Sequence, residues 1–470
     1  MFKLEPHKFF IYCALIFGMI FMMLTPPFQS PDENSHFKKA YAISNGDFYP
    51  ISRDGNIGYE IPVEMENYIN DKLKMAGNKN NKYTFDEMTL DDLSEKDYSE
   101  KNLMDFSTIY VTPLAYIAPS LGILFARITT NIIGLNNISA TNMLYFARFF
   151  SLMLYIIIIA KAIKITPILK KTFCFIGLIP MSLSLASAVS YDNFLIPVCM
   201  LATAIIFKLI FDDNVKTISL KYLVTLGIIG FILLSIKTVY ITILFPLIFV
   251  PKSKYGENIK QIIKSIGIIL VIALSLYILN KIPTIGVTRT SSTNAVNDQI
   301  NFVISQPFTY LRILWDTLIQ NRHFYFTSLF GVFGLLDTYV LTVFIVAYAI
   351  AFLLVIISDL SIADKKFNWK YKLLAFLCTC ASVFGIFLAM YIYWTSDNFD
   401  GGVGSNIING VQGRYFLPLI PLVMVIFSNS WLQKNEKVDS ILHGILNNTY
   451  IVSFCMLTVS SLAILLRFWV

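Results

Sequence analysis

An acidic pair at the start of an expected helix is the first feature of this sequence that could do chemistry. Asp32 and Glu33 follow Ser30 and Pro31, and His36 stands four residues after Asp32, so Asp32 and His36 share one helix face. Ser30 suits the N-cap, Pro31 the first helical position and Glu33 the capping-box position. Carboxylates and an imidazole there could carry out acid–base or metal chemistry at a membrane surface. Alternatively, Glu33 only caps the helix and Asp32 only complements its dipole.

Further polar side chains stand at or near the ends of apolar runs, where an ionisable group is costly unless it has a partner or a function. They are Tyr191, Asp192, Lys237, Arg322, Asp337, Gln412, Arg414 and Tyr415. The planar guanidinium of Arg414 suits a phosphate, and Lys237 suits an anionic ligand. Structural alternatives remain: Asp192 can complete a tight turn, Lys237 can extend to the interface, and Arg414 can anchor the chain beside Tyr415. Asp337 needs a partner, or it lies in water.

Composition indicates a multi-pass membrane protein. Of 470 residues, 56% are hydrophobic and only 14% are charged, against about 25% charged in soluble proteins. The formal charge of +7 comes from Lys and Arg in short loops between apolar runs, so it does not indicate a nucleic-acid partner. The six cysteines fall inside apolar runs, and none has metal-ligand spacing. We interpret them as small packing residues.

Apolar runs predict eleven transmembrane spans, because each approaches the length that crosses a hydrocarbon core. They lie near 9–25, 142–161, 172–189, 192–211, 219–236, 238–250, 265–280, 330–358, 372–394, 414–431 and 447–467. The run 330–358 exceeds one crossing, so its first part is expected to be irregular or tilted. Lysines concentrate in alternate loops, which the positive-inside rule assigns to the cytoplasm. The N-terminus is then cytoplasmic and the C-terminus outside, provided that 108–130 does not cross.

The predicted fold is therefore an all-α integral membrane protein, with residues 1–470 as a single polytopic domain. Two long loops lie outside. The first, 26–141, contains the acidic motif and the segment 108–130, a re-entrant or interfacial helix interrupted by Pro113, Pro119 and Gly122. The second, 281–325, joins spans seven and eight, and its amphipathic part 300–320 should lie on the membrane surface. The unusual charges all fall on the outer side.

Several short stretches together resemble a family of bacterial multi-pass membrane proteins designated domain of unknown function 2142. The matching stretches are Pro26–Glu33 with His36-Phe37, Tyr110–Tyr116, Ser190–Asp192, Gly334–Asp337 and Gln412–Pro418. They occur in the expected order over nearly the whole chain. Within Gly334–Asp337, a leucine stands where an aromatic residue is expected.

The layout also resembles the GT-C superfamily of membrane glycosyltransferases, which has an acidic motif in its first outer loop and a second functional loop between spans seven and eight. This resemblance implies transfer of a sugar from a polyprenyl-phosphate-linked donor to a cell-envelope glycan, a teichoic acid or wall polysaccharide, outside the bacterial plasma membrane. Among the catalytic candidates Asp32, Glu33 and His36, Asp32 would then be the general base, since Glu33 is the residue expected to cap the helix, and His36 would assist or orient it. Lys237, Arg322 or Arg414 would bind the leaving phosphate. A divalent cation, Mg²⁺ or Mn²⁺, would be held by Asp32 and Asp192 where one is needed.

Two other functions remain open. A transporter or flippase for a lipid-linked saccharide would place its functional charges near mid-membrane, within broken helices. An outer-face polysaccharide polymerase or ligase would have a similar topology but would join pre-made chains. Concentration of the charges on one face favours an enzyme over a transporter.

Overall fold

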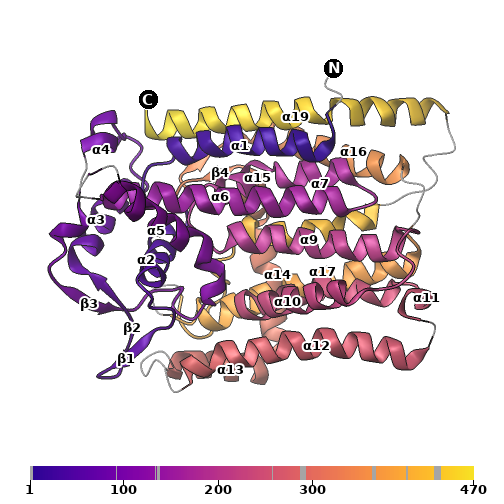
Figure 1. Cartoon of the computed structure of the whole chain (residues 1–470), viewed down its shortest axis with the longest axis horizontal. Helices are drawn as coiled ribbons and strands as arrows, with labels where there is room; N and C mark the ends of the chain where they lie inside the picture. Colours follow the sequence, from indigo (N-terminus) through magenta and orange to yellow (C-terminus); the bar gives the residue numbers. More distant parts are fainter. Residues whose placement is uncertain are drawn as a thin grey trace.

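The long helices lie side by side in one bundle, and residues 26–132 cover one of its ends, here called the covered end (Figure 1). The computed structural model describes residues 4–90, 93–132, 134, 138–256, 258–285, 293–362, 367–397, 401–427 and 436–470. The first helix of the chain runs toward the covered end, and its last helix also finishes there.

Within the described residues, seven helices are long and apolar enough to cross a membrane. They are α1 (Pro6–Leu24), α6 (Ala140–Ile165), α9 (Asp192–Phe211), α12 (Ile259–Lys281), α16 (Thr342–Ile362), α17 (Trp369–Tyr393) and α19 (Glu436–Phe468). An all-α membrane fold is thereby confirmed, whereas the number of crossings and their direction stay predictions. Each of the seven coincides with an expected span.

The remaining expected spans are shorter or broken helices: α7 (Lys170–Gly177) with α8 (Pro180–Ala186), α10 (Leu220–Ile236), η3 (Thr238–Phe249), and η5 (Gly413–Leu419) with α18 (Ile420–Val423) and η6 (Met424–Phe427). Prolines account for several of the breaks, since proline cannot donate the helical N–H bond. Pro180 separates α7 from α8, and Pro246 and Pro418 lie within the 3₁₀ helices η3 and η5.

The covering segment is a small α+β layer. It contains α2 (Glu33–Ser44), β1 (Ile51–Arg53), β2 (Asn56–Pro62), α3 (Val63–Leu73), α4 (Phe85–Leu90), η1 (Glu95–Asp97), β3 (Lys101–Met104), η2 (Pro113–Tyr116) and α5 (Ile117–Ile132). The antiparallel sheet has the order β1-β2-β3. Asp54 and Gly55 both have positive φ at the β1–β2 hairpin, the conformation that such tight turns require.

An apolar core joins this layer to the bundle. Phe37 of α2, Tyr59 of β2, Tyr116 of η2 and Ala147 of α6 are fully or almost fully buried in one cluster. Gly122 allows close approach of α5 to α6, because a Cβ there would lie 2.4 Å from the carbonyl oxygen of Phe146. The position of α2 is therefore fixed by packing against the long helices.

The segment 108–130 forms η2 and α5, and its prolines interrupt it less than expected, because Pro113 and Pro119 fall in the first turns of these helices. One face of α5 packs on α2 and α6, whereas Leu121, Phe125 and Ile128 on another face are exposed. At 16 residues, α5 is shorter than the spanning helices. Its predicted interfacial position stays a prediction.

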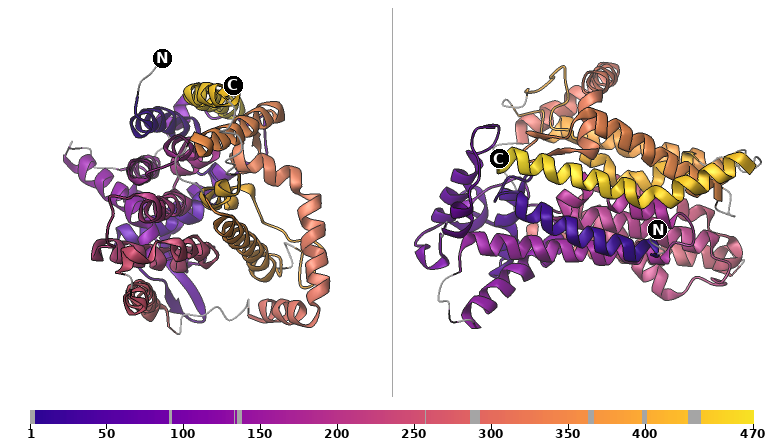
Figure 2. Two further views of the ribbon diagram at one scale, coloured as in Figure 1. Left: turned by 90° about the vertical axis from the view of Figure 1, so that its right-hand side faces the viewer. Right: turned by 90° about the horizontal axis from the view of Figure 1, so that it is seen from above.

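The loop 281–325 forms η4 (Ile282–Thr284), α13 (Thr293–Ser305), α14 (Pro307–Gln320) and the start of α15 (Arg322–Phe330), and its residues 286–292 lie outside the described residues. The amphipathic part divides at Pro307 into two helices. Helix α14 lies across the long helices (Figures 1 and 2) and exposes Phe308, Leu311 and Trp315. The run 330–358 is irregular at first, as expected: β4 (Val332–Phe333) and β5 (Thr338–Tyr339) form a hairpin before α16.

Candidate functional site

Seven of the side chains singled out from the sequence meet at the covered end of the bundle. This outer cluster consists of Asp32, His36, Tyr191, Asp192, Lys237, Arg414 and Tyr415, which come from the start of α2, the turn before α9, the end of α10 and η5. Arg414 joins its parts: Nη2 lies 2.6 Å from Oδ2 of Asp32, and Nη1 lies 3.8 Å from Oδ2 of Asp192. Both carboxylates thus share one guanidinium.

Exposure differs sharply within this group. The side chain of Asp32 is 48% exposed, whereas those of Arg414 and Asp192 are 3% and 6% exposed. Partial desolvation would raise the pKa of Asp32, but the positive charges of Arg414 and Lys237 and the hydrogen bond from Arg414 outweigh it, so the pKa is lowered. Asp32 is therefore an ionised carboxylate that reaches solvent while its partner stays buried.

The backbone at Asp32 has an unusual conformation. Its φ of 59° lies in the left-handed region, and its side chain makes no capping hydrogen bond to α2. Its carbonyl oxygen instead accepts the first bonds of the helix, from the backbone N–H groups of Ser35 and His36. Aspartate tolerates this region better than most residues, yet the conformation still costs free energy. Such strain is found most often at functional sites.

Glu33 does not cap the helix, and the capping-box prediction is wrong. The helix begins at Glu33, with Asp32 as N-cap. The Glu33 carboxylate binds Arg148 of α6 in a two-pronged pair, with Nε–Oε1 of 2.8 Å and Nη2–Oε2 of 2.6 Å. Neither side chain is exposed at all. A strong tertiary partner has replaced the local cap, and we assign Glu33 to the structure rather than to catalysis.

Arg148 fixes the turn that precedes α2. Its N–H groups donate to the carbonyl oxygens of Met22, Thr25 and Pro26, and the backbone N–H of Val189 completes the shell of Glu33. The sequence interpretation missed this residue. The signal was present, since an arginine within the apolar run 142–161 requires a buried partner.

His36 is a neutral, buried imidazole. Its side chain is 1% exposed, Nδ1 lies 2.8 Å from the hydroxyl of Tyr116, and its ring meets that of Tyr191 edge to face at 4.9 Å. Burial lowers the pKa of His36 to about 3, aided by the charges of Arg414 and Lys237 and opposed by Asp32. A neutral imidazole there orients its neighbours and does not act as an acid near neutral pH.

Lys237 supplies a second cation. It lies at the extended junction between α10 and η3, and its Nζ lies 3.9 Å from the ring centre of Tyr415 and 4.9 Å from that of Tyr191. The hydroxyl of Tyr240 donates to the backbone carbonyl of Tyr415 over 2.8 Å and so ties the backbone of η5 to η3. Within the described part of the chain, no carboxylate lies within ion-pair distance of Lys237. Its charge is held by aromatic faces and is available to an anion.

Arg414 also retains unused hydrogen-bonding capacity. Its Nε and the Oε1 of Gln412 are buried without a hydrogen-bond partner among the residues that the structure describes. Gly413 lets this segment approach α15, because a Cβ there would lie 2.2 Å from the carbonyl oxygen of Tyr325, and its N–H donates to Ser328. Buried polar atoms are rarely left unpaired. These two atoms can therefore contact a ligand or an ordered water.

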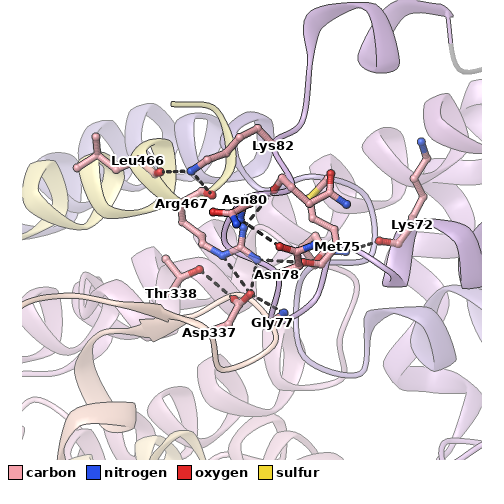
Figure 3. A network of polar contacts seen from close by, with 12 residues as sticks. Lys72, Met75, Gly77, Asn78, Asn80, Lys82, Asp337, Thr338, Leu466 and Arg467 are labelled. Atoms are coloured by element: carbon pink, nitrogen blue, oxygen red, sulfur yellow. Dashed lines mark hydrogen bonds and ion pairs between the residues drawn. The ribbon is translucent and has the colours of Figure 1, made fainter.

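Two predicted substrate-binding residues have their contacts elsewhere. Arg322 is exposed at the start of α15, where Nη1 donates to the carbonyl oxygen of Ile319. Asp337 forms a separate network with the end of α19 (Figure 3), in which Oδ2 lies 2.5 Å from Nη2 of Arg467 and accepts from the backbone N–H of Gly77. The structure does not bring either residue into the outer cluster. For Asp337 the physical reason is its arginine partner, which neutralises it.

A divalent cation fits the outer cluster poorly. Among the described residues, no group of three or more His, Cys, Asp or Glu side chains could hold a metal ion. Asp32 and Asp192, the candidate ligands from the sequence, already face the Arg414 guanidinium. A cation bound by both carboxylates would have to displace that positive charge.

An apolar groove runs beside the segment that carries Arg414. It has a volume of about 290 Å³ and is lined by α15, α16, α17 and the helices η5, α18 and η6. Phe416, two residues after Arg414, and Phe326 line it, and thirteen further side chains complete it, nearly all of them apolar. A hydrocarbon chain in this groove would lie next to η5 and hence near the outer cluster.

Comparison with known proteins identifies a family and nothing finer. A family model described as "Predicted membrane protein (DUF2142)" matches residues 15–423. No curated protein and no solved structure matches the chain.

Proposed function

We propose that this chain, which belongs to the DUF2142 family of predicted membrane proteins, is a glycosyltransferase of the GT-C type. It transfers a sugar from a polyprenyl-phosphate-linked donor to a cell-envelope glycan, a teichoic acid or wall polysaccharide, on the outer face of the bacterial plasma membrane. One observation carries the proposal: a half-exposed carboxylate, Asp32, shares the buried guanidinium of Arg414 with Asp192, and Lys237 stands beside them.

The chemistry needs a base and an anion site within reach of each other. The acceptor hydroxyl oxygen attacks the anomeric carbon of the donor and forms the new glycosidic bond, while its proton passes to the Asp32 carboxylate. The bond between the anomeric carbon and the phosphate oxygen breaks, and its electron pair leaves with the phosphate. Arg414 and Lys237 stabilise the negative charge that develops there. His36 and Tyr191 orient the base.

A phosphate that competes with Asp32 for Arg414 would make Asp32 a stronger base. The guanidinium lowers the pKa of Asp32, which makes the free carboxylate a weak base. The buried Nε of Arg414 has no hydrogen-bond partner among the described residues, so it can donate to a phosphate once the side chain turns. When the guanidinium turns to the phosphate, Asp32 loses its partner and its pKa rises towards the value that suits a general base.

The apolar groove supports a lipid-linked donor. Its lining is nearly free of polar side chains, and it shares η5 with the outer cluster. A polyprenyl chain bound in the groove would lie beside η5, the helix that carries Arg414. A water-soluble sugar nucleotide gives no reason for this arrangement.

The alternative functions predict other arrangements. A transporter or flippase calls for charges near mid-membrane, whereas the cluster lies at the covered end of the bundle. A polysaccharide polymerase or ligase could use the same residues, and it differs in what is joined.

The test measures the composition of the surface glycan in cells that lack this protein and compares it with that in cells that carry the wild type or Asp32→Asn. We expect loss of one sugar substituent in both the deletion and the variant, with the polymer backbone intact and the variant present at normal levels. Loss of the whole polymer would point to the polymerase or flippase instead. An unchanged glycan in both would overturn the proposal.

A further inference from the structure

A second candidate site lies at the other end of α2. A polar cavity of about 390 Å³ opens at the covered end and is lined by residues of α2, η1, β3 and α5, including Tyr41, Glu95, Lys96, Tyr98, Lys101 and Arg127. Small-molecule sites usually measure about 300–1,000 Å³. Asp32 and this cavity stand at opposite ends of a 12-residue helix, which corresponds to about 18 Å along its axis.

One wall of the cavity is rigid. Arg127 of α5 binds Glu95 in a two-pronged pair, with Nη2–Oε1 of 2.6 Å, and its Nη1 donates to the hydroxyl of Ser44 over 3.0 Å. The same guanidinium lies 5.3 Å from the ring centre of Tyr41, and Tyr98 packs on that ring edge to face. Glu95 is fixed in turn by its backbone N–H, which donates to Ile138. A ligand would therefore meet a pre-formed surface.

The other groups are free to bind. Lys96 and Lys101 are exposed, and neither has a carboxylate within ion-pair distance among the residues that the structure describes. The hydroxyl of Tyr98 is buried and makes no hydrogen bond in the same part of the chain. With Arg127 neutralised by Glu95, the cavity carries two uncompensated positive charges and one unsatisfied hydroxyl.

We propose that this cavity binds an anionic saccharide. Sugar hydroxyls both donate and accept, so they can bridge the Glu95 carboxylate, the Tyr98 hydroxyl and a lysine ammonium, and the tyrosine edges offer apolar contact to a sugar face. Lys96 and Lys101 attract a carboxylate or phosphate on the same molecule. Binding itself does not depend on catalysis. Its use as the acceptor site, holding the glycan while a more distant unit reaches Asp32, rests on the proposed function.

Direct binding to the purified chain in detergent micelles tests this site in the absence of donor. The probes are trigalacturonate and glucose 6-phosphate as anionic saccharides, maltotriose as a neutral one, hexaglutamate as an acidic peptide, and inorganic phosphate. We expect at least one anionic saccharide to bind about tenfold more tightly than the other three probes, with affinity falling as salt rises. Equal binding of hexaglutamate or phosphate would reveal charge attraction alone and overturn the proposal.

Variants locate the site. Lys96→Gln with Lys101→Gln should weaken saccharide binding by about tenfold or more, whereas Lys79→Gln, an exposed lysine of the same covering layer, should not. Tyr98→Phe should weaken it less and leave the thermal midpoint unchanged. Unaltered affinity in the double lysine variant would overturn the assignment. Because no donor is present, a chain that binds the saccharide but transfers no sugar would refute the proposed function and leave this site standing.

Discussion

Asp32 and Glu33 are consecutive residues whose carboxylates bind two different arginines on two different sides of the chain. Asp32 pairs with Arg414 and stays half exposed, whereas Glu33 pairs with Arg148 and has no exposed surface. The left-handed backbone conformation at Asp32 points its side chain away from that of Glu33. One carboxylate is therefore available for chemistry, and the other anchors the helix that presents it.

Asp32→Asn should reduce sugar transfer by at least about 100-fold, because an amide cannot accept the proton of the acceptor hydroxyl. The amide keeps the size of the carboxylate, and Asp192 still faces the buried Arg414 guanidinium, so the thermal midpoint should fall less than in Glu33→Gln. The measurement is the initial rate of transfer from a labelled lipid-linked donor by purified protein. A fully active variant would remove Asp32 from the mechanism.

Glu33→Gln should instead destabilise the fold. It leaves the Arg148 guanidinium buried without its counter-charge, which typically costs about 3–5 kcal/mol. Thermal unfolding in detergent should show a clearly lower midpoint. The double variant with Arg148→Met should recover part of the loss, since it removes the stranded charge as well. If Glu33→Gln unfolds like the wild type but transfers no sugar, the roles assigned to the two carboxylates are reversed.

The sequence predicted the outer cluster because charge at the end of an apolar run is rare enough to be informative. Asp32, Asp192, Lys237 and Arg414 were each recognisable in this way, and the structure brings them together. The capping prediction for Glu33 failed because the capping rule considers only neighbouring residues. Its carboxylate instead binds Arg148, 115 residues away along the chain. No local pattern reveals that partnership, since it depends on how α6 packs against the start of α2.

The fold was predictable in its class and less so in its details. The lengths of the apolar runs predicted the positions of the long helices. The breaks at Leu178 and Ile179 and within η3 lie near prolines, and whether a proline breaks a helix depends on its position in the helix. The surroundings of Asp337 could not be predicted either. The hairpin β4–β5 places this residue against Arg467 at the end of α19, and the sequence alone did not show whether it would contact water, substrate or an arginine. Such a contact depends on how the hairpin packs against α19 in three dimensions, which the sequence alone does not reveal.

The Asp337–Arg467 pair should prove structural. Asp337→Asn weakens the tie between the hairpin, the 75–82 segment and the end of α19, so the thermal midpoint should fall and limited proteolysis near the C-terminus should speed up. The KM for donor should stay at the wild-type value in the folded fraction. A raised KM with unchanged unfolding would restore the substrate-binding role predicted from the sequence.

Lys237→Gln should raise the KM for the lipid-linked donor by about tenfold, because it removes one cation of the proposed phosphate site. It frees no carboxylate, since aromatic rings rather than an acid hold Lys237, and the thermal midpoint should therefore be retained. Inorganic phosphate should compete with donor in the wild type and much less in the variant. Lys79→Gln, at an exposed lysine of the covering layer, is the control for loss of one positive charge, and an equal effect there would contradict the assignment.

His36 should make the fold sensitive to mild acid. Its pKa is about 3 in the folded protein and near 6.5 in an unfolded chain, so between these values the unfolded state binds the extra proton. Stability that is complete above pH 6.5 is then lost as pH falls, by about 1.4 kcal/mol per pH unit down to about pH 3. Asp32 opposes this shift, and Arg414 and Lys237 reinforce it.

The neutral variant His36→Asn should lose stability less steeply than the wild type between pH 6.5 and 4.5 in detergent unfolding series, whereas His323→Asn, exposed on α15, should follow the wild type. Parallel pH profiles for His36→Asn and the wild type would show that the imidazole takes up its proton without leaving the folded site.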